Sequence, residues 1–262
     1  MGTLLIERGV PAPPPLWSAW ALLHRPEQVA AIHREYAAAG ARVHTANTFR
    51  AKRRSLGDRW QEAARAAVDL ARGAVPQGHR IAGSIAPLED CYRPDLSPAQ
   101  PRAEHRELAW ALADAGVDLL LCETFPHAAE ARIAVEEAAA TGVETWVALT
   151  AGPMADLMTP EQVVDAAAGC VRAGARAALV NCVSAVRTLP YVEALAQLDA
   201  PVGAYANAGA RADGLGWPAA AGSPGRYAAL PASFRQRLED AFPEIAKDPA
   251  AALRRPPFQF AP

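Results

Sequence analysis

Six short apolar runs, each ending in a cluster of small polar residues, set the strongest limit on how this chain folds. The stretches between them carry apolar residues at helical spacing. Runs that are apolar almost throughout suit strands buried on both faces, and strands that alternate with helices indicate consecutive βα units around a parallel sheet. The runs are RVHTAN (42–47), RIAGSIAP (80–87), VDLLLCET (117–124), TWVALTAG (145–152), RAALVNC (176–182) and PVGAYANAG (201–209).

The polar residues at the ends of these runs predict a single functional site. In an α/β barrel, active sites are built on the rim formed by the C-terminal ends of the strands. Glu123 could instead cap a helix or form an ion pair in a loop. Asn47 could likewise cap the helix that follows it. Ser84 with Gly83 would let a substrate approach the backbone. The residues expected to converge are Asn47, Ser84, Glu123, Thr150, Cys182 and Asn207.

Length and charge exclude several classes of protein. A chain of 262 residues, 51% of them hydrophobic, fits one α/β barrel or one doubly wound domain. The net charge of −2 argues against binding to a nucleic acid. No apolar run reaches the roughly 18–20 residues needed to cross a bilayer, and the first residues do not resemble a secretory signal. We therefore expect a cytoplasmic protein without nucleic-acid or membrane partners.

The four cysteines are scattered without a CxxC spacing, so a disulfide framework is not expected. Cys182 ends the fifth run. Cys122 precedes Glu123 in a strand and should face away from it, toward the helices. Cys170 lies in a predicted helix, and Cys91 lies on a long loop from which it can approach Cys182. The glycine-rich signatures of nucleotide-binding loops are absent from the sequence.

Six motifs, in order and at matching spacing, make residues 1–217 similar to the homocysteine S-methyltransferase family. They are LWSAWALL (16–23), AGARVHTANTFRA (39–51), AGSIAP (82–87), DLLLCETFPHAAEA (118–131), VNC (180–182) and YANAG (205–209). The resemblance implies a zinc-dependent (β/α)8 barrel of the TIM type. It also implies methyl transfer from an activated onium donor, S-methylmethionine or S-adenosylmethionine, to the thiol of homocysteine, giving methionine.

The resemblance also implies roles for individual residues. Glu123 matches the glutamate that holds the amino group of homocysteine, and Cys182 matches the first of three zinc-ligand cysteines. Zinc bound by thiolates takes up the substrate thiol and lowers its pKa. We accordingly expect Glu123 and Cys182 to be catalytic and Cys182 to be a metal-ligand position. Expected substrate-binding residues are Asn47, Ser84, Glu123, Thr124, Asn181 and Asn207.

The chain departs from the family at both ends. It lacks the GGCC motif that supplies the other two zinc ligands, and no cysteine follows Cys182. Residues 1–4 resemble a segment that follows the family's first strand and its acidic motif. We therefore expect an incomplete barrel over residues 1–225, with strands two to seven recognisable. A divergent C-terminal helix and tail would occupy residues 226–262, with the helix near 231–242 and with Phe258 and Phe260 on one face.

These departures leave several functions open. The chain is expected to bind zinc weakly or not at all. It is either an active thiol methyltransferase, whose missing ligands are replaced or come from a partner, or a non-catalytic relative that binds a small molecule or another protein. A truncated gene product is a third interpretation. A barrel aldolase or lyase is disfavoured because no strand end carries a lysine for a Schiff base. The expected partners are small molecules, and a homo-oligomer would cover the open side of the barrel.

Overall fold

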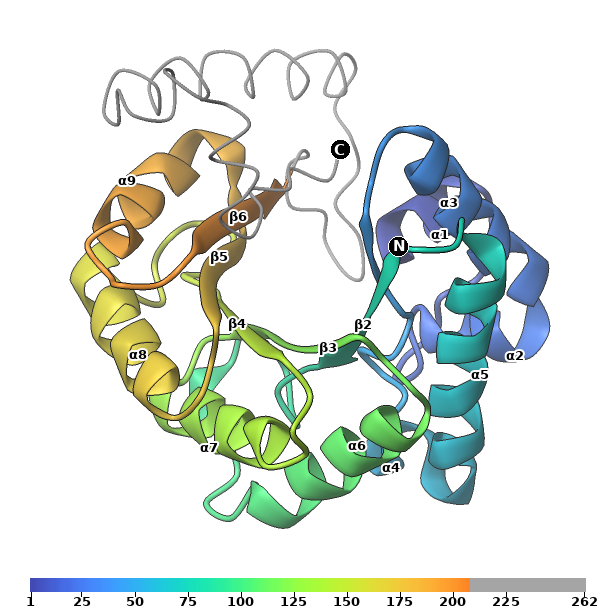
Figure 1. Ribbon diagram of the computed structural model, residues 1–262, viewed down its shortest axis with the longest axis horizontal. Coiled ribbons are helices and arrows are strands. Elements are labelled where there is room, and N and C mark those ends of the chain that lie inside the picture. Colours follow the sequence, from blue (N-terminus) through green and yellow to red (C-terminus); the bar gives the residue numbers. More distant parts are fainter. Residues whose placement is uncertain (208–262) are drawn as a thin grey trace.

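A curled parallel sheet organises residues 1–207, the part of the chain that the computed structural model describes. Its six strands pair in the order in which they occur along the chain, and every pair is parallel. The strands are β1 (Val43–Thr45), β2 (Arg80–Ile85), β3 (Leu119–Phe125), β4 (Thr145–Leu149), β5 (Ala177–Ser184) and β6 (Val202–Asn207). Each begins within one predicted run, and only β3 and β5 extend past the end of theirs, so the predicted fold, an incomplete TIM-type barrel, is confirmed (Figure 1).

Helices cover the outer face of the sheet (Figure 1). The longer ones are α3 (Pro26–Ala38), α5 (Trp60–Ala74), α6 (Arg102–Asp114), α7 (Ala128–Ala139), α8 (Pro160–Arg172) and α9 (Ala185–Leu195), all close to the stretches with helical spacing. The short ones are α1 (Gly2–Glu7), α2 (Ala19–His24), α4 (Arg53–Leu56), η1 (Gly57–Arg59) and η2 (Pro94–Leu96). Sequence analysis did not predict this second group, because so few turns cannot display a helical period.

Alternate residues of each strand pack into two different layers. Leu120 and Cys122 belong to the large cluster between the sheet and the helices, whereas Leu119 and Leu121 belong to a smaller cluster on the inner face. The expectation that Cys122 faces the helices is therefore confirmed. Gly83 faces the same outer layer, since a Cβ there would lie 3.1 Å from the Leu112 side chain. The interpretation that Gly83 admits a substrate is wrong, because its missing side chain makes room for a helix.

Local signals at the helix ends fix where the strands begin. Thr159 and Gln162 form a capping box at the start of α8, and each side chain satisfies a backbone N–H of the other residue. Gly174, just beyond α8, has φ +118°, and a Cβ there would lie 2.8 Å from the Cβ of Ala139. Glycine at this position lets the chain leave the helix and enter β5 through a short connection.

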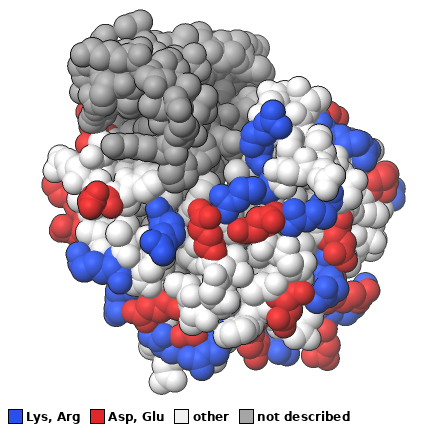
Figure 2. Space-filling view, in the orientation of Figure 1, with Lys and Arg blue, Asp and Glu red and all other residues white. Residues whose placement is uncertain are grey.

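Charges of both signs are interspersed on the face seen in Figure 2. Among residues 1–207, charged side chains form ion pairs, such as Arg54 with Glu104 at 2.6 Å and Arg80 with Glu144 at 2.8 Å. Within residues 1–207, no helix is long and apolar enough to span a bilayer. The predicted tail at 226–262, including its helix and Phe258 and Phe260, lies outside the described residues.

Candidate functional site

Side chains from β2, β3 and β6 meet at Glu123, near the C-terminal end of β3. Ser84 donates a hydrogen bond to Oε1 of Glu123, and the Tyr205 hydroxyl donates to Oε2 at 2.7 Å. At the end of β6, Asn207 donates to the backbone carbonyl of Cys182 at 3.1 Å. Because β6 reaches β3 in this way, the curl of the sheet brings together Ser84, Glu123, Cys182 and Asn207 on one rim, as their positions at the run ends predicted.

The backbone at two rim residues has an unusual conformation. Thr124 has φ +63° and Cys182 has φ +55°. Residues other than glycine rarely adopt such values, and β-branched residues do so least often. The strand register shifts at both places. A left-handed residue interrupts the alternation of a strand, so consecutive side chains can serve the same site. Such strained residues concentrate at functional sites.

The two left-handed residues contact one another through Asn181. The Asn181 amide donates to Thr124 Oγ1 at 2.7 Å and to Cys182 Sγ at 3.3 Å, and Thr124 Oγ1 lies 3.8 Å from the same sulfur. The Oδ1 atom of Asn181 is buried and has no hydrogen-bond partner among the described residues. The site therefore offers a thiol, a hydroxyl and an unused amide acceptor within a small volume.

Burial dominates the protonation of both principal groups. It raises the pKa of Glu123, and the hydrogen bonds from Ser84 and Tyr205 only partly offset this effect. Burial and, to a smaller extent, the charge of Glu123 raise the pKa of Cys182 to about 11, against opposing effects from Thr124 and Tyr92. An added cation would favour the charged form of both groups, the carboxylate and the thiolate.

The described residues around Cys182 do not form a zinc site. A structural or catalytic zinc ion needs at least three protein ligands, and residues 1–207 contain no group of three His, Cys, Asp or Glu side chains placed to hold a metal. Cys122 and Cys170 are buried in the layer between sheet and helices. Cys91, whose pKa burial raises to about 12, lies within the electrostatic influence of Cys182 but adds only one more thiol. The described donors thus do not fit a three-thiolate centre.

Two of the predicted residues have other contacts. Asn47 exchanges hydrogen bonds with Ser18, accepting from its hydroxyl at 2.7 Å and donating to its carbonyl at 2.9 Å. It does not cap α4, whose N-cap is Lys52, so that interpretation is wrong. Thr150 accepts a hydrogen bond from the amide of Gly152 within a turn, at 3.1 Å. Among the contacts of the described residues, neither Asn47 nor Thr150 bonds to Glu123 or Cys182.

The helix-cap interpretation of Glu123 is also wrong. His127 is the N-cap of α7, and its side chain accepts a hydrogen bond from the amide of Glu130. The bonds of Glu123 run instead to Ser84 and Tyr205, across the inner face of the sheet. Glu123 is therefore a buried carboxylate of the rim.

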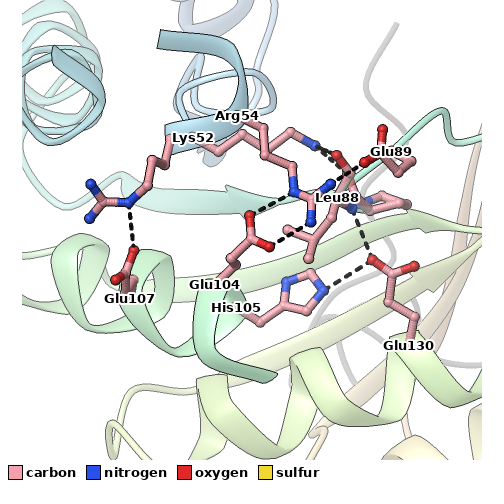
Figure 3. A network of polar contacts seen from close by, with 10 residues as sticks. Lys52, Arg54, Leu88, Glu89, Glu104, His105, Glu107 and Glu130 are labelled. Carbon is pink, nitrogen blue, oxygen red and sulfur yellow. Dashed lines mark hydrogen bonds and ion pairs between the residues drawn. The ribbon is translucent and has the colours of Figure 1, made fainter. Parts of the chain in front are cut away.

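A buried polar network fixes the long loop that follows β2 (Figure 3). Lys52 donates to the backbone carbonyl of Pro87 and to that of Leu88, the second at 2.9 Å. Glu130 accepts from the amide of Leu88 at 2.9 Å, from Ser97 at 2.6 Å and from His105 at 3.1 Å. Burial, and to a smaller extent the nearby charge of Arg50, lowers the pKa of Lys52 to about 7. The network holds in place the loop that carries Cys91 and Tyr92.

Sequence analysis missed two tyrosines of the site. Tyr205 lies two residues before Asn207 in β6, so strand alternation could have placed both on the inner face. Tyr92 lies on the long loop, and its hydroxyl is close enough to Cys182 to lower the pKa of the thiol. No local pattern marks Tyr92, because only the fold brings its loop to the rim.

Comparison with known proteins agrees with this geometry. The chain is 31% identical over 170 residues to the S-methylmethionine–homocysteine S-methyltransferase BHMT2 of Pongo abelii, covering 64% of this chain and 46% of that protein. It is 31% identical over 177 residues to betaine–homocysteine S-methyltransferase 1 of Sus scrofa, covering 63% of each. The chain thus spans about half to two thirds of the length of these curated relatives.

A solved structure and a family model extend the match. The homocysteine methyltransferase MmuM from Escherichia coli, in its metallated form, superposes with a TM-score of 0.69 at 26% identity, over 80% of this chain and 82% of that one. Its oxidized form gives a TM-score of 0.68 at 28% identity, over 79% and 80%. The model of the family described as homocysteine S-methyltransferase matches residues 1–250. The chain belongs to the homocysteine S-methyltransferase family.

Proposed function

We propose that this chain binds homocysteine, or a closely similar amino-acid thiol, with its ammonium group at Glu123 and its sulfur beside Cys182. The observation that carries the proposal is a buried carboxylate and a thiol on one rim, each already held by neighbouring side chains. A carboxylate that stays buried needs a compensating positive group. The ammonium group of an amino acid supplies that charge.

Asn181 supports the same position for the ammonium group. Its Oδ1 atom is buried without a partner among residues 1–207, and leaving such an acceptor unpaired costs about 1–3 kcal/mol. An ammonium group carries three donors, enough to bind Glu123 and Asn181 together. Ser84 and Tyr205 then act on the substrate indirectly, because they fix the direction of the carboxylate.

Methyl transfer to the thiol is the reaction that family membership favours. A thiol reacts as its thiolate, and in this family a zinc ion supplies the charge that deprotonates it. The described residues offer Cys182, hydroxyl and amide groups and the Glu123 carboxylate in place of a three-thiolate centre, and their net effect raises the pKa of the thiol. We therefore propose that residues 1–207 position the acceptor thiol and that turnover needs ligands from outside this set. Binding without turnover is the second candidate, and the same donor set favours it.

An acceptor-binding and turnover experiment tests the proposal. Calorimetry should detect homocysteine binding to the wild-type chain. Glu123→Gln should weaken it about ten- to hundredfold, because one charge-assisted hydrogen bond is worth roughly 1.5–3 kcal/mol. The matched control is Glu144→Gln, since Glu144 lies just before β4 at the opposite end of the sheet and should leave the affinity unchanged.

The reaction itself is measured as methionine formed from homocysteine with S-methylmethionine, S-adenosylmethionine or betaine, with and without added zinc. Methionine formation that requires Cys182 would establish the transferase. Homocysteine binding without methionine would establish the binder. A wild-type chain that does not bind homocysteine would overturn the proposal.

A further inference from the structure

Arg50 follows β1 at the rim and lacks a partner of opposite charge among the described residues. Its Nε atom is buried and has no hydrogen-bond acceptor within residues 1–207. The next two arginines differ: Arg53 binds Glu107 at 3.1 Å and Arg54 binds Glu104 at 2.6 Å. A buried charged donor is unfavourable unless it is paired. Arg50 is therefore prepared for an acceptor that comes from outside residues 1–207.

Aromatic packing holds the Arg50 guanidinium group in place. Its Cζ atom lies 5.5 Å from the centroid of the Phe49 ring, and Phe49 in turn meets Trp17 edge-on at 5.9 Å. Stacking of this kind occupies the flat face of a guanidinium group. The N–H groups in its plane remain available, and they match the two oxygens of a carboxylate.

The chain connects Arg50 closely to the carboxylate anchor. Thr48, two residues earlier, donates to the carbonyl of Ser84 and accepts from its amide, both at 2.9 Å. Ser84 then donates to Glu123. On the other side, the charges of both Arg50 and Cys182 act on Cys91. Arg50 thus belongs to the same rim as the groups that would hold the ammonium and the sulfur.

We propose that Arg50 binds the α-carboxylate of the amino-acid thiol and makes the site selective for acceptors that carry this group. The inference rests on the proposed function, because it adds a third contact to those of Glu123 and Cys182. The ammonium group would then bind Glu123, the sulfur would lie beside Cys182, and the carboxylate would bind Arg50. A thiol that carries an ammonium group alone would use only two of the three contacts.

Two ligands and two arginine variants test this assignment. The ligands are L-homocysteine and 3-aminopropane-1-thiol, which is homocysteine without its carboxylate. Arg50→Met should weaken homocysteine binding about ten- to hundredfold, the range for one charge-assisted hydrogen bond, and change 3-aminopropane-1-thiol binding by less than about twofold. Arg50→Lys should fall between wild type and Arg50→Met, because lysine keeps the charge but cannot bind a carboxylate through two parallel N–H groups.

Arg53→Met is the matched control. The Arg53 guanidinium also lies 5.5 Å from a ring, that of Trp60, but it already pairs with Glu107, so this variant should bind homocysteine like wild type. Equal melting temperatures of the Arg50 variants and wild type would show that the fold is intact. If wild type binds homocysteine and Arg50→Met binds it equally well, the assignment of Arg50 is overturned while the proposed function stands. If wild type binds neither thiol, both fail.

Discussion

Replacing Glu130 by glutamine should destabilise the chain at neutral pH and have little effect in acid. Glu130 is 2% exposed and accepts hydrogen bonds from the Leu88 amide and His105 (Figure 3) and from Ser97. A hydrogen bond to a charged acceptor is worth about 1 kcal/mol more than one to a neutral acceptor, so three bonds give a loss of about 3 kcal/mol. Burying a neutral amide costs less than burying a carboxylate, which leaves a net loss of about 2 kcal/mol.

The pH dependence follows from the pKa of Glu130. Burial alone would raise this pKa, but the bonds from His105, Ser97 and the Leu88 amide hold it below its usual value. A carboxyl whose pKa is lower in the folded state stabilises the fold above its unfolded pKa of about 4.3, and this contribution is lost as the pH falls through the lower folded pKa. The difference between wild type and Glu130→Gln should therefore be largest near neutrality and close toward strong acid.

Urea unfolding and melting curves at several pH values measure this difference. A loss of about 2 kcal/mol corresponds to a melting temperature lower by roughly 4–8 °C in a chain of this size. Glu136→Gln on the same helix is the control, because Glu136 forms partly exposed ion pairs worth at most about 1 kcal/mol. The reasoning is refuted if Glu130→Gln is as stable as Glu136→Gln at pH 7, or if its deficit persists unchanged in acid.

Two further predictions concern Cys182. Its pKa of about 11 predicts that the rate of its alkylation by iodoacetamide rises about tenfold per pH unit between pH 7 and 9.5, because the thiolate is the reacting form. Mass spectrometry identifies the labelled peptide. A rate that levels off near pH 8.5 would contradict the raised pKa. The purified chain should also hold well below one equivalent of zinc after dialysis against a moderate chelator, and a stoichiometric zinc ion that Cys182→Ser removes would show that the chain completes a metal site.

The fold was predictable because its signals are local. Each strand is an apolar run such as TWVALTAG (145–152), and each long helix has a period that a window of one sequence reveals. Glu123 and Cys182 were predicted to share a rim for the same reason, since both stand where a run ends. Only the rule that parallel strands end on one side was needed.

Much of the site could not be predicted because it depends on distant contacts. Thr124 and Asn181 meet although 57 residues separate them, and their contact depends on the left-handed backbone of Thr124, which the preference of threonine for extended structure disfavours. The positions of Tyr92 and Arg50 at the rim depend on how the two loops that carry them pack. The bond of Asn47 to Ser18 depends on the docking of the segment before α2. No motif in the sequence encodes these distances.

The consecutive strand order has a consequence for how the chain is made. Every strand of residues 1–207 pairs only with strands adjacent in sequence, so no pairing has to wait for a segment synthesised much later. Contacts between segments close in sequence require little loop-closure entropy and favour rapid folding. On the ribosome, each new βα unit can dock onto the edge left by the unit before it. Within residues 1–207, the contacts of the rim would then form last, when Tyr205 and Asn207 arrive with β6 to meet Glu123 and Cys182.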